Sequence, residues 1–441
     1  HWLISAGGEG SRRTMTWHDF TISFATPAFL GVDPQNQPAH DQAEPRTVPF
    51  PISSLRGTLR YWLRALVGAH VGNALAELHR VETEVFGAAA GRGQPSKIIL
   101  RARTRMPVEP ADPTDAKEEP PAWLVRRIAY SRSFDSSTSD DFDRQHLRYL
   151  LGQGLYDPRL KKLARRHTPA SDQEIILAVR NQGRVEHANL FLAALWALRT
   201  FGGMGARVHR GFGTVVMRNP PDLNTDFDMS LLQRDSLDDL PQILTAVHRS
   251  LTQMGVPTAH SPELARYPHF DPATSDCPHH RFMDRPLNSD ARDFADALAN
   301  TGKILREKRT FGGLRTYEYD EIVSPYLKDG NPGEEPFCIG AYGLPVGFSD
   351  KAAGRSAVVE PVRRGEPVRR TSPLWLRVRN DGDTWSLRLL AFYSEWLPTD
   401  ITLKIRDTTN NNPMHKPREN QPVTKPDQGE VEGYLDDWFQ E

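Results

Sequence analysis

The residues best suited to hold a charged ligand lie in one glycine-rich segment, Leu198–Val215. Glycine allows positive φ and a close approach of backbone to ligand, and free N–H groups in such a turn can bind phosphate oxygens. Arg207, His209 and Arg210 add positive charge and donors, and Phe212 could stack on a base or pack inward. The segment predicts a clamp for a sugar–phosphate backbone, with a solvated glycine turn as the simpler alternative. The expected contacts are Gly203, Gly205, Arg207, His209, Arg210 and Gly211.

Two common phosphate-binding motifs do not fit this segment. No Gly-Lys-Ser/Thr follows four variable residues, which argues against a P-loop. The segment also lacks the context of a strand that leads through a glycine turn into a helix, as dinucleotide binding requires.

A second basic segment, Pro51–Leu66, predicts a helix with two different faces. Leucines and Trp62 recur at helical spacing and form an apolar face. Arginines recur every four residues and share another face, and the small residues at the start would leave a helix N-terminus that attracts phosphate. A core helix with a solvated arginine stripe is the alternative. The candidate contacts are Ser53, Ser54, Arg56, Gly57, Arg60 and Arg64.

Two further features could do chemistry but are weaker candidates. Histidines, aspartates and a cysteine between His269 and His280 offer zinc ligands, yet their spacing matches no standard zinc finger and Pro278 interrupts them. His209 could transfer protons near neutral pH, but no partner base or nucleophile is marked in the sequence. We therefore expect no metal, no other cofactor and no catalytic residue.

The net charge of −1 over 441 residues hides an uneven distribution of charge. The stretch from Arg199 to Arg218 has four arginines and no acid, whereas Asp381–Glu441 has six basic residues and twelve acidic ones. Because arginine suits bidentate phosphate contacts and stacking on bases, the basic blocks are compatible with a nucleic-acid ligand. A coding bias toward arginine explains its excess over lysine equally well.

The remaining composition is that of a soluble globular chain long enough for two domains. Its two cysteines favour a reducing cytoplasm over a secreted disulfide scaffold. No apolar run is long enough to span a membrane. Met15 is a possible natural start, so we expect residues 1–14 to be a tag or upstream residues.

Strands and helices alternate along both halves of the chain, which predicts an α+β fold. We expect strands near 20–24, 97–103, 214–217, 374–378 and 385–389. Helices are expected near 53–66, 186–201, 241–254 and 289–300. Long loops should fill 33–49, 109–121 and 255–288. The polar stretch 219–240 is the predicted boundary between an N-terminal domain, 15–220, and a C-terminal domain, 235–408. Residues 409–441 should form a flexible acidic tail.

Both basic segments resemble the RAMP superfamily. Pro51–Leu66 is similar to its Arg-Gly-x-x-Arg-x-Trp segment, and Gly202–Gly213 is similar to its glycine-rich loop. Four shorter phrases resemble the first-subunit family of the type III-B CRISPR assembly, the Cmr complex: Thr26–Gly31, Glu84–Gly87, Tyr342–Pro345 and Arg369–Leu374. The resemblance is strong in the first half, and it is not clear over 219–340 and 405–441.

This resemblance implies two ferredoxin-like, RRM-type modules with long insertions. It also implies a non-catalytic RNA-binding subunit of a ribonucleoprotein for antiviral defence, which helps to hold the 3′ part of the guide RNA (crRNA), the target RNA, or both. The expected partners are these RNAs and the other Cmr subunits, with no membrane. Two alternatives stay open: a RAMP-type endoribonuclease that processes guide precursors, and a structural cap that contacts proteins only.

Overall fold

The computed structural model describes most of the chain in fourteen segments. These are residues 16–31, 47–88, 93–108, 123–124, 140–152, 154–157, 162–258, 263–271, 279–287, 291–311, 317–350, 354–382, 384–409 and 418–440. The predicted tag region 1–14 and most of the predicted loops 33–49 and 109–121 lie outside the described residues. Mixed helices and antiparallel sheets confirm the predicted α+β class.

Four strands form the first sheet: β1 (His18–Phe24), β3 (Ile98–Ala102), β7 (Ser171–Asn181) and β8 (Val215–Asn219). Their order is β3-β7-β1-β8, and every pair is antiparallel. Helices α1 (Ile52–Val71) and α2 (Leu75–Phe86) separate β1 from β3, and α4 (Val185–Phe201) separates β7 from β8. The elements of this sheet and its helices therefore follow one another along the chain in the order β-α-β-β-α-β.

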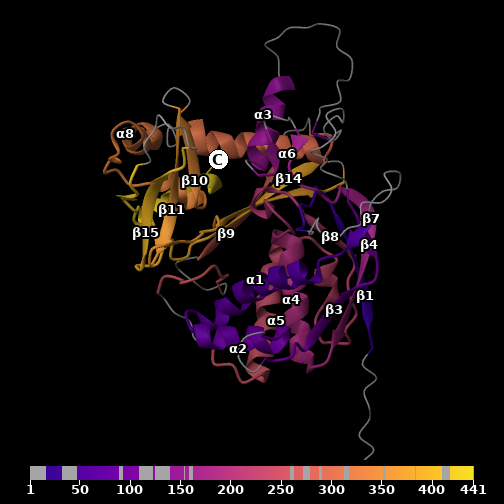
Figure 1. Cartoon of the computed structure of the whole chain (residues 1–441). Helices are drawn as coiled ribbons and strands as arrows, with labels where there is room; N and C mark the ends of the chain where they lie inside the picture. Colours follow the sequence, from indigo (N-terminus) through magenta and orange to yellow (C-terminus); the bar gives the residue numbers. More distant parts are fainter. Residues whose placement is uncertain are drawn as a thin grey trace, which may run out of the picture.

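The first core lies between this sheet and its helices (Figure 1). Phe20, Ile22 and Phe24 alternate along β1 toward it, as the period of two predicts. Trp62 of α1 is fully buried and lies against Phe201 at the end of α4. Nearly every residue of α4 is buried, because helices or sheets cover all of its sides.

Helix α5 (Leu240–Gln253) packs on α1 and α4, and its Ile243, Val247 and Leu251 belong to the first core. From the sequence, this helix was expected to belong to the C-terminal domain, 235–408. The 3-10 turns η3 (Met229–Leu232) and η4 (Leu237–Asp239) occupy the predicted linker 219–240, so the linker itself is packed rather than open.

The second half contains two more sheets. One has the order β13-β14-β9, with β13 (Leu374–Asn380), β14 (Trp385–Phe392) and β9 (His280–Pro286). The other contains β10 (Val346–Asp350), β11 (Arg355–Arg363), β15 (Ile401–Asp407) and β16 (Gln421–Val423), with β12 (Glu366–Pro367) paired to β11. Strand β9 lies in the stretch predicted as loop 255–288, because its alternation of polar and apolar residues is weak.

The sheet β13-β14-β9 joins the two halves, since its two faces belong to different cores. Trp375 and Leu390 point into the first core, whereas Leu376 and Leu389 point into the second. The second core also receives α6 (Phe294–Arg306) and α8 (Ser324–Asp329). Helix α3 (Asp140–Leu151) from the first half packs on α6, so the halves exchange helices rather than meet at one linker.

Short elements complete the chain. They are β2 (Thr47–Pro49) paired with β4 (Arg105–Pro107), β5 (Tyr156–Asp157) paired with β6 (Lys162–Leu163), η2 (Val208–Arg210), the π-helical turns η5 (Glu307–Phe311) and η6 (Tyr319–Val323), and η7 (Cys338–Tyr342). Within the ranges given above, no helix has the length and apolar character needed to cross a membrane.

The C-terminal segment differs from the predicted flexible tail. Residues 418–440 form β16, helix α9 (Gln428–Asp436) and η8 (Asp437–Phe439). Val431, Leu435 and Trp438 are buried in the second core, and a capping box at Asp427 starts the helix. The acidic composition hid three apolar residues at helical spacing, which are enough to dock the segment.

Candidate nucleic-acid interface

Two of the three predicted arginines of α1 have an acidic partner in the neighbouring helix. Arg60 and Arg64 each lie 2.6 Å from the carboxylate of Glu82 in α2. Arg60 also donates to the carbonyl oxygens of Phe86 and Gly87. Burial would raise the pKa of Glu82, but the hydrogen bonds and charges of Arg64 and Arg60 outweigh it and leave that pKa below its usual value. The proposed phosphate contacts at these two arginines are therefore occupied by a structural ion pair.

The start of α1 is different, because its predicted contacts remain open. Ser53, Ser54 and Gly57 are exposed, and a side chain added at Gly57 would meet nothing within 4 Å. Arg56 is half-buried and makes no hydrogen bond or ion pair with any residue in the described segments. No side chain caps the helix, which begins after Pro51.

The glycine-rich loop packs its backbone against other backbone. A Cβ at Gly213 would lie 2.0 Å from the carbonyl oxygen of Met204, and one at Gly205 would lie 2.7 Å from that of Phe29. Both glycines have positive φ, as does Gly211. Met204, Ala206, Arg210, Gly211 and Gly213 all donate their N–H groups within the protein. The predicted close approach therefore exists, but for these N–H groups the partner is the chain itself and not a ligand.

The arginines of this loop hold the end of helix α3. Arg207 donates to the carbonyl oxygen of Leu151, and Arg210 donates to those of Tyr149 and Leu150. The last carbonyls of a helix carry partial negative charge and lack partners in the helix. The two arginines thus fasten α3, which packs on the second core, to the loop of the first half.

His209 is packed as an aromatic side chain. Its ring lies 3.7 Å from that of Trp375, and its Nδ1 lies 3.2 Å from the carbonyl oxygen of Leu374, so Nδ1 carries the proton. Burial, chiefly, lowers the pKa of His209 to about 4. The ring is therefore neutral at physiological pH and serves the junction between the loop and β13.

The two predicted sets of arginines do not line one groove. Those of α1 contact α2, and those of the loop contact α3. Gly203 lies against the backbone of Gly213, where it too is structural. Acceptors within the fold therefore already hold Arg60, Arg64, Arg207 and Arg210.

Positive charge nevertheless collects where the halves meet. Four arginines, which we call the seam arginines, lie close enough to influence one another: Arg165, Arg207, Arg210 and Arg309. Burial, and then repulsion from Arg207 and Arg309, lowers the pKa of Arg210. Arg165 and Arg309 were not predicted from the sequence, because neither lies in a recognisable motif.

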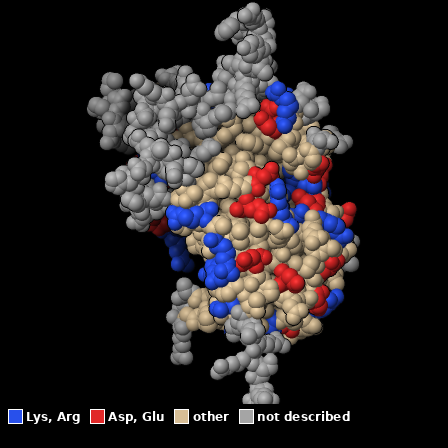
Figure 2. All heavy atoms as spheres, turned by 90° about the vertical axis from the view of Figure 1, so that its right-hand side faces the viewer, with Lys and Arg blue, Asp and Glu red and all other residues tan. Residues whose placement is uncertain are grey.

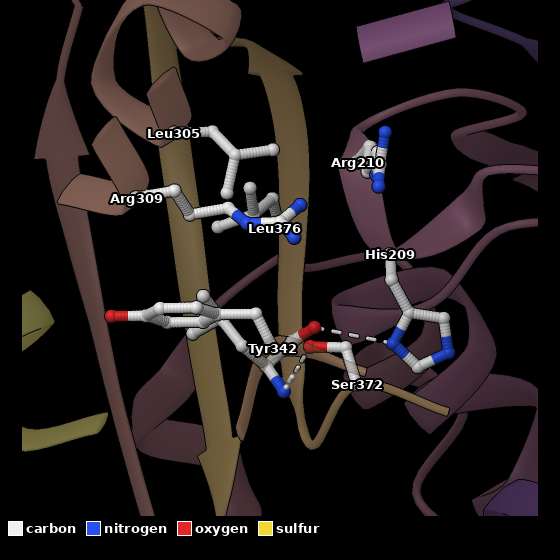
Figure 3. A pocket seen from close by; sticks show the side chains of 8 residues that line it. His209, Arg210, Leu305, Arg309, Tyr342, Ser372 and Leu376 are labelled. Atoms are coloured by element: carbon white, nitrogen blue, oxygen red, sulfur yellow. Dashed lines mark hydrogen bonds between the residues drawn. The ribbon is translucent and has the colours of Figure 1, made fainter. Parts of the chain in front are cut away.

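A cavity opens beside two of the seam arginines (Figure 3). It contains about 290 Å³ of atom-free space, part of which opens to solvent. Its lining comes from the loop, the end of α6 and η5, η7, and the start of β13. The lining residues are His209, Arg210, Leu305, Arg309, Tyr342, Ser372, Leu374 and Leu376.

The outer face of the first sheet offers no comparable concentration of charge. Figure 2 shows the side of the molecule where β1 and β7 lie in Figure 1, with basic and acidic side chains interspersed over it. Arg218 pairs there with Asp172, and Arg103 pairs with Asp19. Such mixed pairs neutralise one another and leave no extended basic patch among the residues drawn in colour.

The histidine cluster that suggested zinc is held by hydrogen bonds instead. Asp271 accepts from the backbone N–H of His279 and lies 3.3 Å from Nδ1 of His280. Asp276 and Cys277 lie outside the described residues. Among those described, no group of three or more His, Cys, Asp or Glu side chains is arranged to hold a metal ion.

Comparisons with known proteins point to one family. The model of the RAMP superfamily matches residues 21–216. A curated relative, CRISPR system Cmr subunit Cmr1-2 of Pyrococcus furiosus, is 25% identical over 177 residues, which are 40% of this chain and 87% of that protein.

Two solved structures align with most of the chain. One is Cmr1 from Pyrococcus furiosus in its apo form, with 17% identity, coverage of 96% of this chain and 97% of that one, and a TM-score of 0.48. The other is a chain of the type III-B Cmr-beta complex bound to cognate target RNA, with 14% identity, coverage of 87% and 97%, and a TM-score of 0.45.

Proposed function

We propose that this chain, whose residues 21–216 match the model of the RAMP superfamily, is a non-catalytic, RNA-binding subunit of a type III-B CRISPR effector. It would act in the cytoplasm, where it would help to hold guide RNA, target RNA or both beside the other Cmr subunits. Its first half carries the family match and the sheet with the β-α-β-β-α-β order.

The observation that carries RNA binding is the group of seam arginines. Arg165 is exposed, and its charge acts on Arg207 in the glycine-rich loop. Four guanidinium groups gathered at one place attract phosphate, and Arg165 can reach solvent and a strand that passes over the seam. In this proposal Arg207 and Arg210 contribute electrostatic field from within the fold, and Arg165 contributes the direct contact.

The start of α1 is the second proposed contact. Arg56 has no partner among the described residues, and Ser53, Ser54 and Gly57 are exposed around it. The positive end of the helix dipole adds to the charge of Arg56 there. A strand of RNA would meet charged groups at two places, with Arg60 and Arg64 contributing little because Glu82 neutralises them.

RNA affinity measured against salt concentration tests this proposal. Each phosphate contact releases counterions, so binding should fall steeply as salt rises. Arg165→Ala and Arg56→Ala should each reduce the slope of log affinity against log salt by about one, with a similar loss for different RNA sequences. Arg266→Ala is the matched control, because Arg266 is exposed and its side chain forms no hydrogen bond or ion pair with any described residue.

Three outcomes would contradict the proposal in different ways. A salt-independent or undetectable affinity would favour the structural cap. Equal losses in the control variant would mean that only net charge matters. Cleavage of labelled RNA that disappears in His209→Ala would favour the endoribonuclease, although the packing of His209 on Trp375 gives that reading no support.

We further propose that the second half is a reduced ferredoxin-like module. Strand β9 is followed by α6 and, after an insertion that contains β10, β11 and β12, by β13 and β14. The sheet order β13-β14-β9 is that of the second, third and first strands of the fold. Native-state hydrogen exchange tests this, since these strands should open as one unit, separately from β10-β11-β15-β16. A single opening of both sheets would contradict it.

A further inference from the structure

We propose that the cavity between the glycine-rich loop and β13 is a binding site for one phosphate-class oxyanion, which braces the two halves of the protein. Residues from both halves line it: His209 and Arg210 come from the first half, whereas Arg309, Tyr342 and Ser372 come from the second. This inference rests on the proposed function in that it uses two of the seam arginines, Arg210 and Arg309. It does not depend on Arg165, and it can be tested without RNA.

The strongest observation is the position of Arg309. Its side chain is only 7% exposed, and its Nε has no hydrogen-bond partner. Figure 3 shows its guanidinium group pointing into the cavity, between Leu376 and the space below Arg210. A buried cation without a counter-ion costs several kcal/mol unless something compensates it. The ring of Tyr342, 5.8 Å from the guanidinium carbon, supplies only a weak attraction.

No carboxylate in the described segments neutralises the cavity by an ion pair. Neither Arg210 nor Arg309 forms a salt bridge there. Glu318 lies within range of the charge of Arg309; it is 1% exposed and accepts from the backbone N–H of Ile339. Burial raises the pKa of Glu318 to about 8, so at neutral pH this carboxyl is mostly protonated and leaves the arginine charges uncompensated.

The hydrogen-bonding groups of the cavity suit an oxyanion better than a cation or an apolar ligand. The hydroxyl oxygen of Ser372 accepts from the N–H of Leu374, which leaves its own hydrogen free to donate. Arg210 and Arg309 supply guanidinium donors from two sides (Figure 3). His209 takes no part, because its protonated Nδ1 already serves Leu374 and its other nitrogen points away from Arg309 (Figure 3).

The size of the cavity limits the ligand. The atom-free space of about 290 Å³ includes open solvent, so the enclosed part is well below the roughly 300–1,000 Å³ of pockets for drug-sized molecules. Leu305, Leu374 and Leu376 line the rest and offer no partner for the polar edges of a sugar or base. A tetrahedral oxyanion therefore fits best, either as free phosphate or as a single phosphate of an RNA backbone that enters from the open side.

Binding would link the halves through charge. The oxyanion would touch Arg210, whose guanidinium already fastens the end of α3, and Arg309, which follows α6. Because α3 packs on α6, the ligand would tighten a contact that already spans the two cores. Ligand binding to the folded state alone raises its stability in proportion to the logarithm of ligand concentration.

The test is a thermal unfolding series on the full, RNA-free chain. Inorganic phosphate at 10 mM, compared with chloride at equal ionic strength, should raise Tm of the unaltered protein by about 2 °C. Arg309→Met should abolish this phosphate-dependent rise while leaving Tm in chloride unchanged or higher, since it removes a buried unpaired cation. Arg309→Lys should keep part of the rise, and Ser372→Ala should weaken phosphate affinity about fivefold. Arg266→Met, which removes an exposed charge, is the control.

A second arm identifies the source of the phosphate. Short single-stranded RNA is titrated into the unaltered protein and into Arg309→Met. Weaker RNA binding by the variant, together with loss of the phosphate effect, assigns the site to an RNA phosphate. Unchanged RNA binding with the same loss assigns it to free phosphate. An equal Tm response to phosphate and chloride, or the same phosphate response in Arg309→Met and Arg266→Met, overturns the site, whatever the RNA results show.

Discussion

Two groups of arginines differ in how the surrounding residues neutralise their charge. On the joining sheet, Arg377, Arg379 and Arg388 surround Asp235 at 3.1, 3.1 and 2.6 Å, and Asp284 lies 2.7 Å from Arg388. We call these five residues the Asp235 network. Among the seam arginines, Arg210 has backbone carbonyls and other arginines as its neighbours in the described residues instead. Burial alone therefore does not separate a structural arginine from one available to a ligand, but the presence of a carboxylate does.

This difference suggests a division of tasks along the junction of the halves. The Asp235 network ties β13 and β14 to the first half, since Arg388 also donates to the carbonyl oxygen of Thr200 and Arg377 to that of Val215. Its charges are satisfied, so it has little left to attract RNA. Arg210 and Arg309 form no ion pair with a described carboxylate, and such uncompensated charge costs stability and is retained where a ligand can offset it.

Removing the central carboxylate should have the largest effect. Asp235→Asn would leave three buried guanidinium groups without their shared counter-ion, and we expect a loss of about 3–5 kcal/mol in the free energy of unfolding. Urea unfolding measures it. Asp172→Asn, which breaks an exposed pair with Arg218, should cost no more than about 1 kcal/mol. A small loss in both variants would mean that the two groups of arginines do not differ.

The same network predicts a dependence on pH. The charges of Arg377, Arg388 and Arg379 outweigh burial and hold the pKa of Asp235 well below its usual value. A carboxyl with a lowered pKa contributes stability above its unfolded pKa and loses it as pH falls toward the folded one. As the pH falls below about 4, the difference in unfolding free energy between the unaltered protein and Asp235→Asn should therefore shrink progressively, as measured by urea unfolding at each pH.

The sequence predicts the elements whose apolar periodicity reflects one buried face, but it does not predict contacts between different elements. Strand β1 and helices α1 and α4 follow from apolar periodicity, because one buried face imposes the period on the residues. The same reasoning placed Arg60 on a polar face but could not reveal Glu82, which comes from another helix. Partners across elements are set by packing, and no local pattern contains them.

The glycine-rich loop shows the other limit. Its composition correctly indicated a special backbone, since Gly205, Gly211 and Gly213 all have positive φ. Composition could not tell whether the close neighbour would be a ligand or the chain, and Gly213 against Met204 gives the second answer. Arg309 was missed because its stretch carries no motif, and only the fold brings it beside Arg210.

The state of the charge near Arg309 can also be tested at an acidic residue, the buried Glu318. Its pKa of about 8 lies above the unfolded value, so its burial costs stability as pH rises from about 4.5 to 8 and changes little beyond. Glu318→Gln should remove this slope and stabilise the protein at pH 8 by about 4 kcal/mol, with little change at pH 4. A variant that keeps the slope would place the titration elsewhere, with Cys338 and Arg309 as the nearest charged or ionisable neighbours.

The smallest effects should come from the arginines of α1, because this helix contains two arginines with a carboxylate partner and one, Arg56, without a partner among the described residues. Arg60 has a buried partner and two carbonyl acceptors, so Arg60→Ala should cost about 1–2 kcal/mol of unfolding free energy. Because the side chain of Arg64 is 46% exposed, Arg64→Ala should lower the free energy of unfolding by no more than about 0.5 kcal/mol. Neither change should alter the salt slope of RNA binding, whereas Arg56→Ala should. If Arg64→Ala weakened RNA binding as much as Arg56→Ala, a carboxylate partner would not be what withdraws an arginine from RNA, and the distinction between the two groups would fail.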